Sequence, residues 1–181
     1  KIMDLTKSLL AGLLLFATAV QADVKPSKLF ANNMVIQRDT QAPVWGWADA
    51  GEKVTVKTSW GEKASATANA KGKWLLRIKT TSATTKSQSL SISSAQNPKS
   101  TVTFSNVVVG DVWIASGQSN MAFGQRQALN PDKEERDFPF VRTFNLQRMA
   151  TDIPQERIPL QQTWTGCTPR TAYHFSAAAL F

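Results

Sequence analysis

The sequence has few of the side chains that build disulfides and metal sites. Its 181 residues include one cysteine, Cys167, and one histidine, His174. A single cysteine closes no internal disulfide, so the stability of the fold comes from its core. We expect Cys167 to be structural, because no neighbour in the sequence would activate its thiol. A metal site needs a cluster of His, Cys or carboxylate ligands, so the sequence predicts no metal and no cofactor.

Clusters of like charge are also missing. The formal net charge is +8, from 21 Lys and Arg against 13 Asp and Glu, but the basic residues stand singly along the chain. A nucleic-acid interface needs basic residues gathered on one face, so we expect no nucleic-acid partner. A basic protein still gains some attraction to anionic glycans.

The first long apolar run, Leu9–Val20, lies near the N-terminus. It follows Lys1 and Lys7, and the small residue Ala22 comes soon after it, which is typical of a signal peptide over residues 1–22. The alternative is a buried core helix. The run is short for a membrane span, and no cysteine follows it to carry a lipid. We expect cleavage after Ala22 and an exported, periplasmic or secreted protein without a membrane anchor.

No segment of residues 23–106 has a convincing helical period. Val54 and Val56 alternate with polar neighbours, as in a strand with one buried face. Several short segments of this kind, separated by turn residues, predict an antiparallel β-sandwich domain over residues 23–106. The other alternating segments are Ala64–Ala68, Trp74–Ile78, Leu90–Ile92 and Val102–Phe104.

Four tryptophans in this region allow two interpretations. Trp45 and Trp47 lie two residues apart and share one face if the chain is extended. We favour the core for them, because tryptophan is mostly buried. In the alternative, a secreted β-sandwich glycan-binding module, Trp45, Trp47, Trp60 and Trp74 would stack on sugars.

The pattern changes after Asn106. Val112–Ala115 is a run of consecutive apolar residues, which predicts a strand buried on both faces of a parallel sheet. A serine, Ser119, follows at the carboxyl edge where such sheets place their ligands, so it is a candidate nucleophile or only a turn residue. Met121 stands where an α/β-hydrolase elbow, Gly-x-Ser-x-Gly, needs its second glycine, so that motif is excluded.

The pentapeptide Gly117-Gln-Ser-Asn-Met121 resembles the first block of the SGNH hydrolases, in the variant found in the sialate O-acetylesterase family of carbohydrate acetylesterases. Upstream segments resemble the same family in the same order, so the resemblance extends over most of the chain from Leu29 to Met121. These segments are Leu29–Arg38, Pro43–Ala48, Gly51–Val56 and Gly72–Trp74.

The resemblance implies a flavodoxin-like SGNH α/β hydrolase domain over residues 107–181, with Ser119 as nucleophile. It implies that the backbone N–H of Ser119 contributes to the oxyanion hole. Gly117, Gln118 and Asn120 match the motif, and we assign Gln118 and Asn120 to shaping the nucleophile turn. The implied substrate is O-acetylated sialic acid or another acetylated glycan, and a related specificity such as acetylxylan stays open.

The same resemblance places the catalytic histidine late in the domain, with its aspartate three residues before it. Thr171 stands at that position before His174, so His174 does not match the motif. We expect it to be structural or solvent-facing, because no carboxylate orients it. The catalytic His and Asp, and the remaining oxyanion donors, are then absent from this chain.

The last residues predict a helix. Thr168 would be its N-cap and Pro169 its first helical residue, and it would continue to Phe181 with an uncapped apolar tail. We expect a truncated α/β domain, and a chain that is the N-terminal part of a longer esterase and inactive alone. The absence of methionine at position 1 points to incompleteness at the front too. The oligomeric state stays open.

Overall fold

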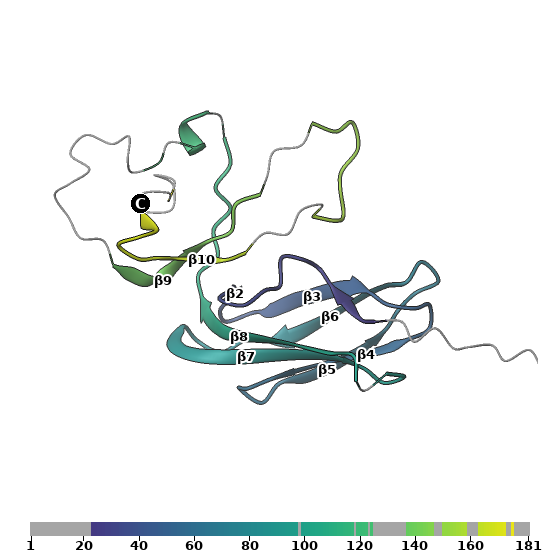
Figure 1. The fold of residues 1–181 in the computed structure, drawn as a ribbon. Helices are drawn as coiled ribbons and strands as arrows, with labels where there is room; N and C mark the ends of the chain where they lie inside the picture. The colour runs from purple at the N-terminus through teal and green to yellow at the C-terminus, as the bar shows by residue number, and fades with distance from the viewer. Residues whose placement is uncertain are drawn as a thin grey trace, which may run out of the picture.

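The computed structural model describes residues 23–97, 99–117, 119–122, 124, 137–146, 150–158, 163–172 and 175 (Figure 1). These residues form ten strands and one 3-10 helix, and none of them lies in an α-helix. The predicted signal peptide lies outside the described residues. The elements are β1 (Lys25–Pro26), β2 (Val35–Gln37), β3 (Gln41–Trp47), β4 (Lys53–Thr58), β5 (Lys63–Thr67), β6 (Lys73–Lys79), β7 (Thr84–Ser94), β8 (Thr101–Gly110), η1 (Ser119–Ala122), β9 (Phe138–Thr143) and β10 (Thr165–Cys167).

Two sheets pack against each other across one core. The smaller has the order β1-β3-β6 and the larger has the order β2-β8-β7-β4-β5. Figure 1 shows them as two stacked layers. The alternation predicted from the sequence is present, since Val54 and Val56 of β4 are completely buried between polar neighbours. Both sheets contribute to the core, which includes Val44, Trp74 and Ile78 from one and Val54, Val56, Leu90 and Ile92 from the other.

Gly46 of β3 lies where the backbone and an indole ring approach closely. A Cβ at this position would be 2.4 Å from the carbonyl oxygen of Lys25 and 2.7 Å from Cζ2 of Trp74. The Lys25 contact is with backbone, so it cannot be relieved by rotating a side chain. Only glycine fits between β1 and the Trp74 ring without a shift.

Gly46→Ala is expected to lower the free energy of unfolding by about 2 kcal/mol, because overpacking forces β1 or Trp74 to move. Urea denaturation measures the change. Gly110→Ala is the matched control, since a Cβ there meets only Val35 Cγ1 at 3.7 Å, an ordinary contact. Equal stability of the two variants would contradict the close packing at Gly46.

One parallel strand pair determines where the chain leaves the larger sheet. β2 runs parallel to β8, and its last residue, Gln37, is the register partner of Gly110, the last residue of β8. The residues that follow β2 therefore lie beside the residues that follow β8. The second of these segments leads to Ser119.

A second part of the chain, around the antiparallel pair β9 and β10, packs on the first. Its own small core contains Cys167, Ala172 and Phe175. Trp164 Nε1 donates a hydrogen bond to the Leu29 carbonyl oxygen at 2.9 Å. The Arg157 guanidinium lies over the Trp47 ring, 4.2 Å from its centroid. Figure 1 shows this part above the two stacked sheets.

The predicted buried strand at Val112–Ala115 is wrong. The four residues form no strand, and the side chains of Trp113 and Ile114 are 88% and 94% exposed. A strand buried on both faces needs neighbouring strands and covering helices. No strand among the described residues pairs with this run, so nothing buries it.

The predicted C-terminal helix is not formed by residues 168–172, which the structure describes. Thr168–Ala172 makes a turn, in which the Ala172 N–H donates to the Thr168 carbonyl at 2.8 Å. The Thr171 hydroxyl accepts from the Thr168 N–H at 2.9 Å, in the reverse sense to the predicted cap. Residues 173–174 and 176–181, which would complete the helix, lie outside the described residues.

The Glu156 carboxylate forms an ion pair with Lys73 of β6. Hydrogen bonding to Lys73 lowers the pKa of Glu156 below its ordinary value of 4.5. A lowered folded-state pKa means that the stabilising contribution is complete above pH 4.5 and is lost as the pH falls through the folded pKa.

An NMR titration of Glu156 is therefore expected to have its midpoint below 4.5, and Lys73→Met should return it toward that value. Lys71→Met is the control and should shift the midpoint less, because Lys71 is only a minor cause of the lowered pKa. A midpoint at or above 4.5 in the unmodified protein would exclude the pair in solution.

Candidate active site

Ser119 lies at the start of η1, after segment 111–117, which leaves β8 without regular secondary structure. Figure 1 shows this short helix at the far end of that segment, away from the two sheets. Ser119 is exposed. A nucleophile must be reached by its substrate, and the position of Ser119 meets that requirement.

The first and last residues of the pentapeptide 117–121 touch each other. A Cβ at Gly117 would be 2.9 Å from Cγ of Met121, which is closer than real Cβ contacts. The turn that presents Ser119 therefore brings Gly117 close to the Met121 side chain. A glycine at position 117 permits this close approach because it has no Cβ. Gln118 lies outside the described residues, and Asn120 is described only as part of the η1 backbone.

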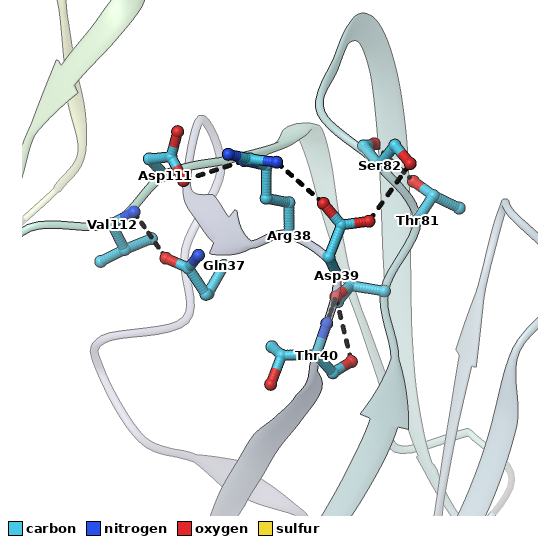
Figure 2. A network of polar contacts seen from close by, with 9 residues as sticks. Gln37, Arg38, Asp39, Thr40, Thr81, Ser82, Asp111 and Val112 are labelled. Carbon is cyan, nitrogen blue, oxygen red and sulfur yellow. Dashed lines mark hydrogen bonds and ion pairs between the residues drawn. The ribbon is translucent and has the colours of Figure 1, made fainter.

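A network of polar contacts holds the beginning of the segment that leads to Ser119 (Figure 2). Arg38 Nε donates to Asp111 Oδ1 at 2.9 Å, and Arg38 Nη1 donates to Asp39 Oδ2 at 2.9 Å. The Val112 N–H donates to Gln37 Oε1 at 2.8 Å. The hydrogen bond to Asp111 is the largest of the causes that raise the pKa of Arg38, so this guanidinium is always charged.

A second arginine, Arg142 of β9, binds backbone carbonyl groups of the two-sheet part. It donates to the Asn33 carbonyl at 2.9 Å, to the Asn106 carbonyl and to Asn106 Oδ1 at 3.1 Å. Partial burial lowers its pKa. Asn33 and Asn106 both have positive φ, 65° and 53°, so the arginine holds two left-handed bends together.

Among the described residues we identify no catalytic base for Ser119. His174 lies outside the described residues. Cys167 is completely buried in the small core with Phe175, where a thiol packs as a small apolar group, as expected. Within the described ranges, no three His, Cys, Asp or Glu side chains gather as metal ligands do. The same ranges contain no helix with the length and apolar character needed to cross a membrane.

The four tryptophans considered as sugar platforms pack against the protein. Trp74 is 2% exposed. Trp45 meets Phe30 edge to face, with ring centroids 4.9 Å apart, and Trp60 donates its indole N–H to the Lys79 carbonyl at 3.0 Å. Trp47 is covered by Arg157. Trp45 packs against the main core, in agreement with the preferred interpretation, whereas Trp47 is half-buried and is not among the residues of that core.

A cleft of about 600 Å³ lies between the segment after β1, the first half of β8, and Trp164. Phe30, Phe104 and Asn32 line it. Some of its polar groups are already paired, since Asn32 Oδ1 accepts from the Ser105 N–H at 2.9 Å. Ser119 is not among its lining residues, so the cleft adds no group to the candidate nucleophile.

Sequence reasoning did not find Arg142 or the pairing of Arg38 with Asp111. The available sequence signal for Arg38 was its place in Leu29–Arg38, one of the segments that resemble the family. Arg142 binds carbonyl groups, which every residue carries, so no sequence pattern marks its partners.

Comparison with known proteins relates the chain to acetylesterases. It is 28% identical over 124 residues to rat sialate O-acetylesterase, covering 64% of this chain and 23% of that protein. It is 26% identical over 130 residues to the mouse sialate O-acetylesterase, covering 67% of this chain and 24% of that protein. The chain thus spans about a quarter of the length of these relatives. No protein-family model matches it.

A solved structure shares the fold. A carbohydrate acetylesterase from Xanthomonas citri matches with a TM-score of 0.74 and 27% sequence identity, covering 87% of this chain and 35% of that one. Residues 1–106 are less than two thirds of the chain, so a match of that extent includes residues after Asn106. The predicted resemblance to sialate O-acetylesterase is confirmed by these sequence and structure relatives.

Proposed function

We propose that this sialate O-acetylesterase-like chain is the N-terminal part of a carbohydrate O-acetylesterase that uses Ser119 as its nucleophile. The observation that carries the proposal is an exposed serine on a tight turn, in a pentapeptide of the family type. Its relatives are named as acetylesterases, which supports the chemistry. Because the chain covers a minor part of each, the activity belongs to the longer protein.

The reaction is acyl transfer in two steps. Ser119 Oγ attacks the acetyl carbonyl carbon while a base takes the hydroxyl proton, and the oxyanion forms beside the Ser119 backbone N–H. The bond from the acetyl carbon to the sugar oxygen then breaks, and the sugar oxygen takes up that proton. Water attacks the acetyl-enzyme in the same way and releases acetate. The base and its orienting carboxylate come from a part of the longer protein outside this chain.

We assign the two-sheet part to a β-sandwich domain and residues 107–181 to the start of an SGNH α/β domain. The exposed Trp113 and Ile114 support this assignment. Two consecutive large apolar side chains in water are costly, at roughly 2 kcal/mol each compared with a buried position. Contact with the rest of the longer protein would bury both.

O-acetylated sialic acid is the proposed substrate. The names of the curated relatives support it, and so does the net charge of +8, because sialic acid carries a carboxylate. Acetylated xylan is the competing substrate, and its backbone is neutral.

The substrate is tested with the full-length gene product, recovered by sequencing beyond the codon for Phe181. Acetate release is measured from O-acetylated sialic acid and from acetylated xylan. Faster release from the sialic acid is expected, and the preference should weaken at high salt if charge contributes. Release from xylan alone would overturn the sialate assignment and leave the acetylesterase assignment intact.

The proposal includes export. Val24, two residues after the predicted cleavage site, is 2% exposed, and its N–H donates to Ser100 Oγ at 3.1 Å. Val24 is therefore already part of the fold, and cleavage after Ala22 would leave this contact intact, which supports the proposed leader over residues 1–22. N-terminal sequencing of the exported protein should give Asp23 first. A cytoplasmic protein that retains residues 1–22 would overturn this part of the proposal.

A further inference from the structure

We propose that Arg38 is a positioning residue for Ser119: with Gln37 and Asp39 it fixes the direction in which the chain leaves β8 for the nucleophile turn. This inference rests on the proposed function of Ser119. Arg38 is distant from Ser119 in the sequence. It acts through Asp111 and the segment that follows Asp111.

The first step is the spatial overlap of two chain segments. β2 and β8 are parallel and end together, with Gln37 beside Gly110. The Arg38 N–H continues the pairing by donating to the Gly110 carbonyl at 2.9 Å. The Gln37 side chain then accepts from the Val112 N–H, and the Arg38 side chain binds Asp111. Three consecutive residues at the exit from β8 are therefore held by the last residue of β2, Gln37, and by the residue after it, Arg38.

The second step is the anchoring of Arg38 itself. Its guanidinium lies between two carboxylates, those of Asp111 and Asp39 (Figure 2). Asp39 is fixed in turn, since its N–H donates to the Thr81 carbonyl at 3.1 Å and its Oδ1 accepts from Ser82 Oγ at 3.2 Å. The rigid guanidinium fork thus connects the β6–β7 loop to the exit segment.

Asp39 has a backbone conformation that is uncommon for residues other than glycine. Its φ is +51°, in the left-handed region, which aspartate tolerates better than most residues. The tight bend turns the carboxylate back toward Arg38, and a residue without a polar side chain would lose that contact. The sharp turn between β2 and β3 is therefore part of the network.

The third step is that the ion pairs of Arg38 orient the exit segment but contribute little to the stability of the fold. The side chains of Arg38, Asp39 and Asp111 are 42%, 49% and 50% exposed. Surface ion pairs of this kind contribute at most about 1 kcal/mol, so removing one should hardly change stability. The segment 111–117 has no strand partner among the described residues, and the network is what orients its start.

The distance to the nucleophile turns a small change of angle into a large displacement. Ser119 lies seven residues after Val112, a reach of roughly 20 Å when the chain is extended. A rotation of about 5° at the exit would move Ser119 by about 2 Å if the segment moves as one body. Displacements of 1 Å at a reacting atom cost on the order of 100-fold in rate.

The test compares variants of the full-length esterase in release of acetate from O-acetylated sialic acid. Arg38→Gln is expected to lower kcat by roughly 10-fold to 100-fold with KM within about twofold. It should slow covalent labelling of Ser119 by a fluorophosphonate by a similar factor and leave Tm nearly unchanged. Arg38→Lys should recover part of the rate, because an ammonium keeps the charge without the fork.

Two further variants make the test specific. Asp111→Asn should reproduce the loss, and the double variant Arg38→Gln with Asp111→Asn should be no slower than either single variant, since both remove one contact. Arg77→Gln is the matched control, because Arg77 is an exposed arginine of the two-sheet part that donates to the Gln41 carbonyl. It should keep the unmodified kcat.

The outcomes separate this inference from the proposed function. If Arg38→Gln keeps the unmodified kcat while Ser119→Ala is inactive, the positioning role is overturned and the nucleophile stands. A loss of kcat that matches a loss of folded protein also overturns it. If Ser119→Ala stays active, the proposed function itself fails.

Discussion

Ser119→Ala in the full-length protein is expected to lower the rate of acetate release from O-acetylated sialic acid by on the order of 10⁴-fold or more. The substitution removes the oxygen that forms the bond to the acetyl carbon in the proposed reaction. The side chain is exposed and only one atom is lost, so the fold should be unaffected. Acetate release and Tm are measured together.

The chain offers a matched control three residues before Ser119. Ser116 is also exposed and lies in the same segment, but it precedes the glycine of the turn. Ser116→Ala should keep the unmodified rate. A Ser119→Ala variant that hydrolyses the substrate at the unmodified rate would show that another residue is the nucleophile.

Arg142→Met is expected to lower the free energy of unfolding by roughly 3 kcal/mol, the largest stability change that we predict. Methionine keeps most of the apolar stem and removes every donor, so the carbonyl groups of Asn33 and Asn106 lose charge-assisted hydrogen bonds. The β9–β10 pair should then separate more readily from the two sheets. Hydrogen exchange of the amides in β9 and β10 measures this opening.

Arg170→Met is the control for Arg142→Met. Arg170 belongs to the same part of the chain and is exposed. Its replacement should change the unfolding free energy by less than about 0.5 kcal/mol. Unchanged exchange in β9 and β10 after Arg142→Met would mean that other contacts, such as Trp164 with Leu29, hold the two parts together.

Local patterns in the sequence predicted local structure well. The alternation around Val54 and Val56 gave a strand with one buried face, because alternation is a property of a strand itself. Trp74 and Cys167 are both buried, which agrees with the general behaviour of these side chains. The division into domains and the site residues stay predictions.

Features that depend on distant residues were not predicted, or were predicted wrongly. Val112–Ala115 has the composition of a central strand, but burial requires partners, and the described part of the chain supplies none. Arg38 and Asp111 are 73 residues apart, and no local pattern links them. They meet because β2 pairs with β8 in parallel, a pairing that alternation alone does not specify.

The most direct test of the account is to trap the acyl-enzyme. The full-length protein is mixed with O-acetylated sialic acid, quenched in acid during turnover and digested, and the peptides are sequenced by mass spectrometry. One acetyl group is expected on Ser119, absent from the Ser119→Ala variant and from protein without substrate. Turnover with no acetyl group on Ser119, or with the acetyl group on another residue, would contradict the account.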